Sequence, residues 1–255
     1  MAVSSGDVTM RVWRGEPGQG GQFQEYRVES GEGMVVLDVI HRIQATQQPD
    51  LAVRWNCKAG RCGSCSAEIN GRPRLMCMTR MSSLPVGQPI TVAPLKTFPL
   101  IKDLVTDVSF NFEKAKSVPA FKPKPVEADG TRRMYQEEVD RVQEFHKCIE
   151  CFLCQNVCHV LRDHEASQEA FAGPRLFVRL AALEMHPLDR ADRVGMAAKA
   201  GVGHCNVTGC CTEVCPEGIR ITPNAIIPLK ERLADRYYDP IARLLGLFSN
   251  SWEDA

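Results

Sequence analysis

The chain has 255 residues, enough for two domains of ordinary size, and 44% of them are apolar, as in a globular protein. Its 31 basic side chains balance its 31 acidic ones, so the charge favours a plain soluble surface and no nucleic-acid partner. We expect neither a secretory leader, judged from residues 1–9, nor a membrane span, which needs roughly 20 consecutive apolar residues.

The unusual feature of the composition is cysteine. There are twelve cysteines, and they fall into the groups 57–77, 148–158 and 205–215. In a reducing compartment, clustered cysteines bind metal more often than they form disulfides. We therefore expect an intracellular metal-binding protein, and the spacing within each group indicates the kind of metal site.

Residues 1–115 are predicted to form a mixed sheet with one crossing helix. The stretches 9–13 and 22–28 alternate apolar and polar side chains around a Gly-rich loop, which is typical of a hairpin. The run 35–43 has the apolar spacing of one helical face. Short strands are expected at 66–70, 74–78 and 90–92, with Asn70-Gly71 as the turn between the first two.

The first cysteine group has the plant-type spacing of a 2Fe–2S cluster, C-x4-C-x2-C followed by a distant fourth cysteine. Gly60 and Gly63 allow the backbone to fold closely around the cluster and to turn its amides toward the sulfides. Structural zinc prefers paired C-x2-C knuckles, so the spacing argues against zinc. The predicted ligands are Cys57, Cys62, Cys65 and Cys77.

A Pro-rich, aperiodic segment at 116–131 is predicted to be a linker. Residues 132–255 are predicted to be helical, with Gly173-Pro174 at the start of a helix. Helical spacing is found at 137–145, 174–184 and 225–234. The apolar stretch 241–248, which ends near Trp252, is too short to span a bilayer; it is expected either to lie at a membrane interface or to pack as a core helix.

The second group, C-x2-C-x2-C-x3-C, matches the bacterial ferredoxin run, in which the fourth cysteine ligates the other cluster. The third group repeats this frame with Thr208 in place of the second cysteine. One predicted 4Fe–4S cluster is then held by Cys148, Cys151, Cys154 and Cys215. The other cluster has only three thiolates, which predicts a 3Fe–4S cluster held by Cys158, Cys205 and Cys211.

Cys210 belongs to neither frame. We expect it to be a spare thiol that packs as a small hydrophobe, and the alternative is a fourth ligand that completes a second 4Fe–4S cluster. His159 and His204 lie beside cluster cysteines and are interpreted as ordinary polar residues; the alternative is a proton relay or a hydrogen bond that tunes a cluster. Two zinc ions or a Rieske centre would fit these cysteine frames poorly.

The combined pattern resembles the iron–sulfur subunit of succinate dehydrogenase and fumarate reductase, over about residues 9–235. The resemblance implies an α+β chain, with an N-terminal β-grasp plant-type ferredoxin domain at 1–115, a linker at 116–131 and an all-α bacterial-ferredoxin-like domain at 132–255. The local phrases that carry it are Cys62-Gly63-Ser64-Cys65, Ile69-Asn70-Gly71, Leu75-Met76-Cys77, Cys148-Ile149-Glu150-Cys151 and Cys211-Thr212-Glu213-Val214-Cys215-Pro216.

The resemblance also implies partners and a location. It implies a flavoprotein subunit with covalent FAD and the dicarboxylate site, one or more membrane-anchor subunits, and a quinone near the 3Fe–4S cluster. The chain itself would be peripheral, at the cytoplasmic face of the inner membrane. Family members with the well-known quinone site carry Ser and Trp after the cysteine matching Cys158 and His after the one matching Cys205. This chain has His159, Val160, Leu161 and Asn206 there, so those quinone contacts are not carried over.

The residues agree with a role in electron transfer. The Gly-rich stretch 18–21 is not followed by a predicted helix, so it is no dinucleotide fingerprint, and no nucleophile–base arrangement stands out. We therefore expect a subunit of an oxidoreductase without a dicarboxylate site of its own. The alternatives are the iron–sulfur subunit of a thiol-linked fumarate reductase or of another flavin-linked dehydrogenase, such as a glycerol-phosphate or glycolate dehydrogenase, and a zinc-bearing interaction protein.

Overall fold

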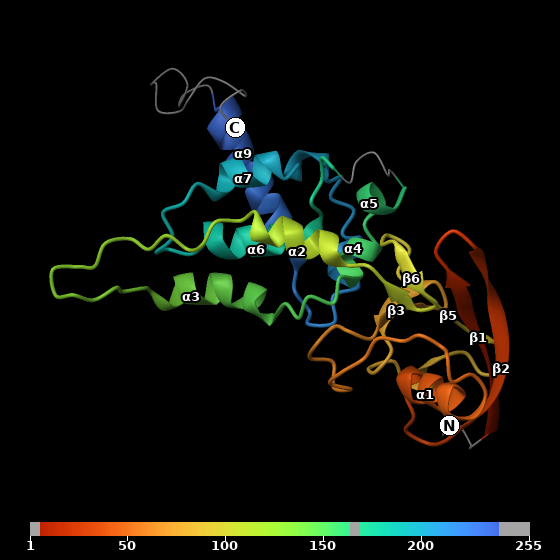
Figure 1. The fold of residues 1–255 in the computed structure, drawn as a ribbon. Coiled ribbons are helices and arrows are strands. Elements are labelled where there is room, and N and C mark those ends of the chain that lie inside the picture. Colours follow the sequence, from red (N-terminus) through yellow and green to blue (C-terminus); the bar gives the residue numbers. More distant parts are fainter. Residues whose placement is uncertain (1–5, 164–168, 240–255) are drawn as a thin grey trace. The chain divides into compact units, whose positions relative to one another are not determined.

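The computed structural model describes residues 6–163 and 169–239 (Figure 1). These residues form two compact units. The first holds residues 6–108 together with Ile149–Val157, and the second holds Ser109–Cys148 with residues 158–163 and 169–239. The apolar stretch 241–248 and Trp252 lie outside the described residues.

The first unit is built on a five-stranded sheet in the order β2-β1-β5-β3-β4. Neighbouring strands are antiparallel, except that β1 and β5 run parallel. Figure 1 shows β1 and β2 as one long hairpin in red, so the predicted hairpin and mixed sheet are confirmed. The strands are β1 (Gly6–Glu16), β2 (Gly20–Ser30), β3 (Ser66–Ile69), β4 (Arg72–Leu75) and β5 (Ile90–Ala93).

The predicted helix at 35–43 is also confirmed, as α1 (Val36–Thr46). The Asp38 carboxylate accepts a hydrogen bond from the amide of Val35 at 3.1 Å, which supports the start of the helix. The helix buries one apolar face, formed by Val36, Leu37, Val39, Ile40 and Ile43. Smaller elements of this unit are η1 (Met81–Ser83), β6 (Leu100–Lys102), β7 (Val105–Thr106) and α4 (Leu153–Asn156).

The predicted strand at 74–78 is wrong in its second half. Strand β4 ends at Leu75, because the amides of Met78 and Thr79 both donate to the Leu75 carbonyl at 3.1 Å and close a turn. The amide of Met76 donates to the Cys65 carbonyl at 3.0 Å. Cys77 therefore lies in a tight turn that is tied to the first cysteine loop, and not in the sheet.

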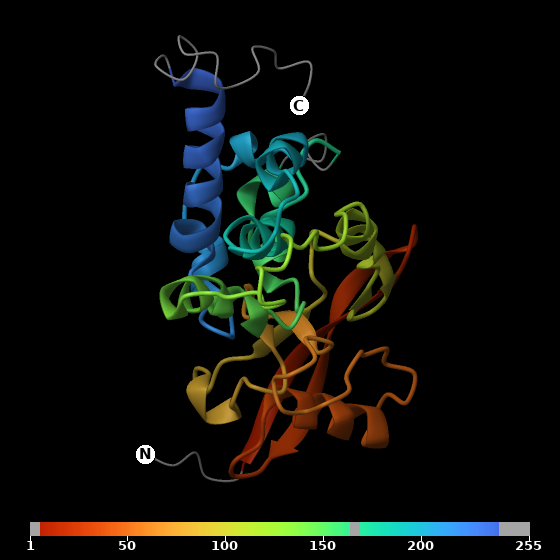
Figure 2. The same cartoon turned by 90° about the vertical axis from the view of Figure 1, so that its left-hand side faces the viewer.

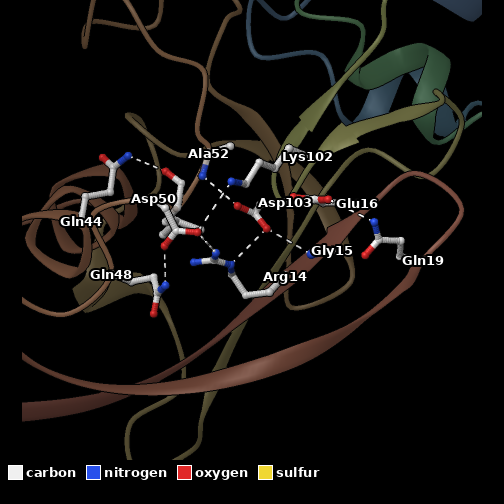
Figure 3. Close-up of polar contacts among 11 residues, drawn as sticks. Arg14, Gly15, Glu16, Gln19, Gln44, Gln48, Asp50, Ala52, Lys102 and Asp103 are labelled. Atoms are coloured by element: carbon white, nitrogen blue, oxygen red, sulfur yellow. Dashed lines mark hydrogen bonds and ion pairs between the residues drawn. The ribbon is translucent and has the colours of Figure 1, made fainter.

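A buried carboxylate joins three segments of the first unit (Figure 3). Asp103, 1% exposed with φ 49°, accepts hydrogen bonds from Arg14 Nε at 3.0 Å, from the Gly15 amide at 3.1 Å and from the Ala52 amide at 2.9 Å. Arg14 also pairs with Asp50 at 2.6 Å. Asp103 thus links β1, the β6–β7 turn and the segment that leads into the first cysteine loop.

The described part of the second unit is formed by helices and one isolated β-bridge, between Pro123 and Asp189. The helices predicted at 137–145, 174–184 and 225–234 are present, the first split between α3 and η2 and the last between η5 and α9. Figure 2 shows α9 in blue, and it packs on α6 and α7. The elements are α2 (Ser109–Lys116), α3 (Gln136–Gln143), η2 (Glu144–Lys147), α5 (His159–Asp163), α6 (Pro174–Glu184), α7 (Arg193–Lys199), η4 (Val202–His204), α8 (Cys210–Glu213), η5 (Ile221–Ile226) and α9 (Ile227–Tyr238).

Arg193 is fully buried and holds part of the Pro-rich segment in place. Its guanidinium donates to the carbonyls of Pro119 at 2.8 Å and Ala120 at 3.0 Å, and it pairs with the Asp189 carboxylate at 2.8 Å. The amide of Lys122 also donates to Asp189 at 3.0 Å. None of the helices in the described ranges 6–163 and 169–239 is both long enough and apolar enough to cross a membrane.

Candidate iron–sulfur centres

The first cysteine loop lies between α1 and β3 and is shaped to present its sulfur atoms. Lys58, Gly60 and Gly63 have positive φ values of 54°, 68° and 67°, which curl the backbone around the loop. The amides of Ala59 and Arg61 donate to Cys57 Sγ at 3.4 and 3.3 Å. Amides that point at sulfur are what a negatively charged cluster requires, so the loop fits a 2Fe–2S cluster.

The thiols of this group affect one another electrostatically. Burial alone would raise the pKa of Cys62, but hydrogen bonds from Ser64 and Cys57 lower it to about 7. The pKa of Cys65 is raised to about 12, chiefly by burial and in part by the charges of Cys77 and Cys62. These contacts link neighbouring thiols of the group Cys57, Cys62, Cys65 and Cys77, and their role as the ligands of one cluster stays a prediction.

A side chain on either of two glycines of the loop would meet neighbouring atoms. A Cβ on Gly60 would lie 2.9 Å from Met78 Sδ, and a Cβ on Gly63 would lie 2.5 Å from Cys151 Cα. Flexible Met78 can move, but the backbone at Cys151 cannot. Gly63 is thus required for two reasons: its positive φ forms the turn, and its lack of a side chain allows the first cysteine loop to approach the segment with Cys151.

The segment with Cys151 and Cys154 belongs to the first unit and is bound to its sheet. The Ser66 hydroxyl donates a shared hydrogen bond to the carbonyls of Gly63 and Cys151, each at 2.8 Å. Fully buried Asn156 donates from Nδ2 to the buried Glu68 carboxylate at 2.9 Å. Sequence reasoning missed Ser66, Glu68 and Asn156, because no local pattern marks them as partners.

The remaining predicted ligands of the 4Fe–4S cluster, Cys148 and Cys215, belong to the second unit. Burial raises the pKa of Cys215, and the charge of Cys148 contributes to the rise. Glu150 and Phe152 have positive φ values of 55° and 60°, so the backbone turns sharply within the C-x2-C-x2-C run.

The third group lies within the second unit, on a loop whose backbone also has positive φ values. Val207 and Gly209 have positive φ values of 61° and 83°, and the Val207 amide donates to Cys205 Sγ at 3.5 Å. Cys211 Sγ lies 3.2 Å from Thr222 Oγ1. Thr208, at the position of the missing cysteine, is exposed, and its hydroxyl lies 3.4 Å from Cys210 Sγ.

The charge of Cys210 acts on two buried thiols. The pKa of Cys158 and of Cys211 is raised to about 11, chiefly by burial, and the charges of Cys210 and Cys205 are part of that rise. The structure thus brings Cys158, Cys205 and Cys211 together, and it places half-buried Cys210 in the same neighbourhood. The spare-thiol and fourth-ligand interpretations of Cys210 both remain predictions.

The histidines beside these cysteines have ordinary surroundings in the structure. His159 and Asp163 form an exposed pair at 3.4 Å one helical turn apart. His204 is exposed at the end of η4.

All twelve cysteines are free thiols. In the part of the chain that the structure describes, no group of three or more His, Cys, Asp or Glu side chains is arranged to hold a metal ion. In an iron–sulfur cluster the thiolates bind several iron atoms, whereas a single metal ion needs all its ligands around one point. Loops with inward amides and positive φ values are suited to holding a cluster. The fold and these loops define a ferredoxin-type iron–sulfur protein with two cluster-binding parts.

Two family models match the chain. Residues 9–113 match a 2Fe-2S iron-sulfur cluster binding domain, and residues 144–219 match a 4Fe-4S dicluster domain. The fumarate reductase iron-sulfur subunit of Mycobacterium tuberculosis is 35% identical over 207 residues, which cover 77% of this chain and 80% of that relative. The corresponding protein of Wolinella succinogenes is 32% identical and covered to 94%. The chain belongs to the family of iron–sulfur subunits of fumarate reductase and succinate dehydrogenase.

Two further similarities bear on function. A chain of the Mycobacterium smegmatis Sdh1 complex in the apo form is 64% identical, with a TM-score of 0.89, covering 93% of this chain and 100% of its own. One of the subunits of the CoM/CoB fumarate reductase of Methanothermobacter marburgensis is 30% identical over 88% of this chain. The chain spans 44% of that relative's length.

Proposed function

We propose that this chain is the electron-transfer subunit of a succinate:quinone oxidoreductase. In this role it passes single electrons between the FAD of a flavoprotein subunit and a membrane quinone through three clusters. The observation that carries the proposal is the spacing of the free cysteines: all but Cys210 fit the ferredoxin ligand pattern, and nearby loops have amides or positive φ values that suit a cluster.

Each site has a defined set of residues. Each cluster, once bound, accepts and releases one electron at a time. The amides of Ala59, Arg61 and Val207 offset negative charge on the cysteine sulfurs that they face. The proposed ligands are Cys57, Cys62, Cys65 and Cys77 for 2Fe–2S, Cys148, Cys151, Cys154 and Cys215 for 4Fe–4S, and Cys158, Cys205 and Cys211 for 3Fe–4S.

The domain arrangement that goes with this function is a β-grasp plant-type ferredoxin domain at 1–115, a linker at 116–131 and an all-α bacterial-ferredoxin-like domain at 132–255. The dicarboxylate site is assigned to the flavoprotein partner. Membrane-anchor subunits hold the complex at the cytoplasmic face of the inner membrane, with the quinone near the 3Fe–4S cluster.

A second candidate function is thiol-linked fumarate reduction. The similarity to the CoM/CoB fumarate reductase over 88% of this chain favours it. Thr208 occupies the position of a cysteine in the third group, so the second cluster of the dicluster domain has only three cysteine ligands at the expected spacing. This favours the quinone-linked function. The purified complex separates the two: the first proposal expects electrons to pass between succinate and a quinone analogue, and the second expects oxidation of thiols by fumarate.

The experiment that tests the clusters is electron paramagnetic resonance (EPR) on the anaerobically purified complex, oxidised and then reduced in steps. We expect a 3Fe–4S signal in the oxidised sample, joined on reduction by 2Fe–2S and 4Fe–4S signals. An EPR-silent oxidised sample with iron for two 4Fe–4S clusters would make Cys210 the fourth ligand. A colourless, iron-free complex that contains zinc would overturn the proposal.

A further inference from the structure

The hydroxyl of Thr222 faces the sulfur of Cys211 from a neighbouring helix. The two atoms, Thr222 Oγ1 and Cys211 Sγ, are 3.2 Å apart, and both residues are buried, at 5% and 4% exposure. Cys211 lies in α8 and Thr222 in η5, and these two elements pack against each other. The pair therefore lies inside the second unit, out of contact with bulk water.

A second hydrogen bond holds Thr222 in this position. The backbone amide of Thr222 donates to the Thr212 hydroxyl at 2.9 Å. Thr212 directly follows Cys211 in α8. Thr222 therefore bonds to two adjacent residues of this helix: its amide bonds to the Thr212 hydroxyl, and its hydroxyl bonds to the Cys211 sulfur. The Thr222 hydroxyl is thus placed by the packing of α8 on η5.

The direction of the side-chain bond follows from the proposed role of Cys211. A thiol and a hydroxyl can each donate, and the free protein allows either direction. A cysteine that ligates iron is a thiolate and has no proton to give. In the cluster-loaded protein, the hydroxyl is therefore the donor and the sulfur the acceptor.

We propose that Thr222 is a positioning residue that donates a hydrogen bond to the Cys211 thiolate and thereby raises the reduction potential of the cluster that Cys211 holds. This inference rests on the proposed function. Reduction adds one negative charge to the cluster and its sulfur ligands, so a donor aimed at the sulfur stabilises the reduced state more than the oxidised one. Burial strengthens the effect, because no water competes for the bond.

The test is a redox titration of the purified complex, followed by EPR, with the Thr222→Val variant. Valine keeps the shape of threonine and replaces the hydroxyl with a methyl group, which cannot donate a hydrogen bond. We expect the oxidised-to-reduced ratio of that one cluster to rise by about tenfold at a fixed potential, which is a fall of about 59 mV for a one-electron couple. The potentials of the other two clusters should stay unchanged, and Thr222→Ser should remain close to the unaltered chain.

Thr46→Val is the control, because it deletes an exposed hydroxyl in α1 that donates to the Arg42 carbonyl at 2.8 Å. We expect it to leave the potential unchanged. The inference is wrong if Thr222→Val leaves the potential unchanged, if Thr222→Ser lowers it as much, or if Thr46→Val does so. Should Thr222→Val fail to take up the cluster, Thr222→Ser and Thr222→Ala form a second pair that differs only in the hydroxyl.

The outcome also separates this inference from the function on which it rests. An unaltered complex without a third cluster signal would contradict the proposed function, and this inference with it. A normal cluster whose potential is indifferent to the Thr222 hydroxyl would contradict this inference alone.

Discussion

The Ser66 hydroxyl donates a hydrogen bond to the Cys151 carbonyl at 2.8 Å. Ser66 follows Cys65, a proposed ligand of the 2Fe–2S cluster, and Cys151 is a proposed ligand of the 4Fe–4S cluster. The same hydroxyl also bonds to the Gly63 carbonyl at 2.8 Å. One small side chain thus ties two cysteine loops together within the first unit, although 85 residues separate them in the chain.

Replacing Ser66 with alanine removes this bond and leaves the two carbonyls without the donor. We expect a loss of about 0.5–1.5 kcal/mol in the free energy of unfolding, measured by urea denaturation of the cluster-loaded protein. Ser83→Ala is the control, because Ser83 donates only to the nearby Arg80 carbonyl at an exposed site. Equal losses in the two variants would show that the bond to Cys151 contributes nothing of its own.

Gly63→Ala should damage the first cluster site far more than Gly71→Ala. Both glycines have positive φ values, 67° and 73°, so both variants incur roughly 1–2 kcal/mol of backbone strain. Only at Gly63 does the new Cβ also meet backbone, 2.5 Å from Cys151 Cα, whereas Gly71 has nothing within 4 Å.

Iron and sulfide content and the 2Fe–2S EPR signal are the measurements for this pair. We expect Gly63→Ala to lose the signal and Gly71→Ala to retain it. Retention of a full signal in Gly63→Ala would mean that the close approach to Cys151 is not required for assembly.

The Asp103 carboxylate should be a large contributor to the stability of the first unit. Asp103→Ala leaves half-buried Arg14 without one of its carboxylate partners and two amides without acceptors; a fully buried pair costs about 3–5 kcal/mol to break, which is the upper bound here. Asp103→Asn should cost less, because asparagine tolerates the positive φ and keeps an acceptor oxygen.

Chemical denaturation checks this order, with Glu25→Ala as the control. Glu25 pairs with Arg11 at 3.5 Å on the exposed surface, where such pairs are worth about 0–1 kcal/mol. A Glu25→Ala loss as large as that of Asp103→Ala would contradict the importance of the buried carboxylate.

Arg193→Met should destabilise the second unit, because it leaves the Asp189 carboxylate, 2% exposed, without its charge partner. We expect a loss of about 3–5 kcal/mol at neutral pH, measured by thermal or chemical unfolding. Arg133→Met is the matched control, since Arg133 is 69% exposed and its pairs lie at the surface. A control loss of the same size would overturn the special role of Arg193.

The same pair predicts a pH dependence. Burial alone would raise the pKa of Asp189, but the hydrogen bonds from Arg193, Ala191 and Lys122 lower it below its ordinary value of 3.8. A carboxyl with a lowered folded-state pKa stabilises the fold above its unfolded-state pKa and loses that contribution as the pH falls through the folded-state value.

Unfolding at a series of pH values from about 6 downward measures this contribution. We expect the stability of the unaltered chain to fall on acidification through the Asp189 transition. Arg193→Met should lose less stability than the unaltered chain over that range, because its unpaired carboxylate is relieved by protonation. Parallel curves for the two proteins would contradict the assignment to Asp189.

The sequence by itself determined the features that depend on neighbours along the chain. Ligand spacing, the β1–β2 hairpin, helix α1 and the Gly173-Pro174 helix start are set within a few residues, by alternation, helical periodicity and turn chemistry. The cysteine groups could be predicted for the same reason, because each cluster takes most of its cysteine ligands from one short segment.

Only the tertiary structure decided which distant polar groups meet. Three hydrogen-bonded pairs join segments whose local sequence patterns do not predict the contact: Ser66 with Cys151, Asp103 with Arg14, and Thr222 with Cys211. The end of β4 at Leu75 was missed because a turn held by backbone hydrogen bonds leaves no mark in side-chain alternation. A hydrogen bond needs two groups brought within about 3 Å, and that proximity is a product of the packed fold and not of either residue's sequence neighbourhood.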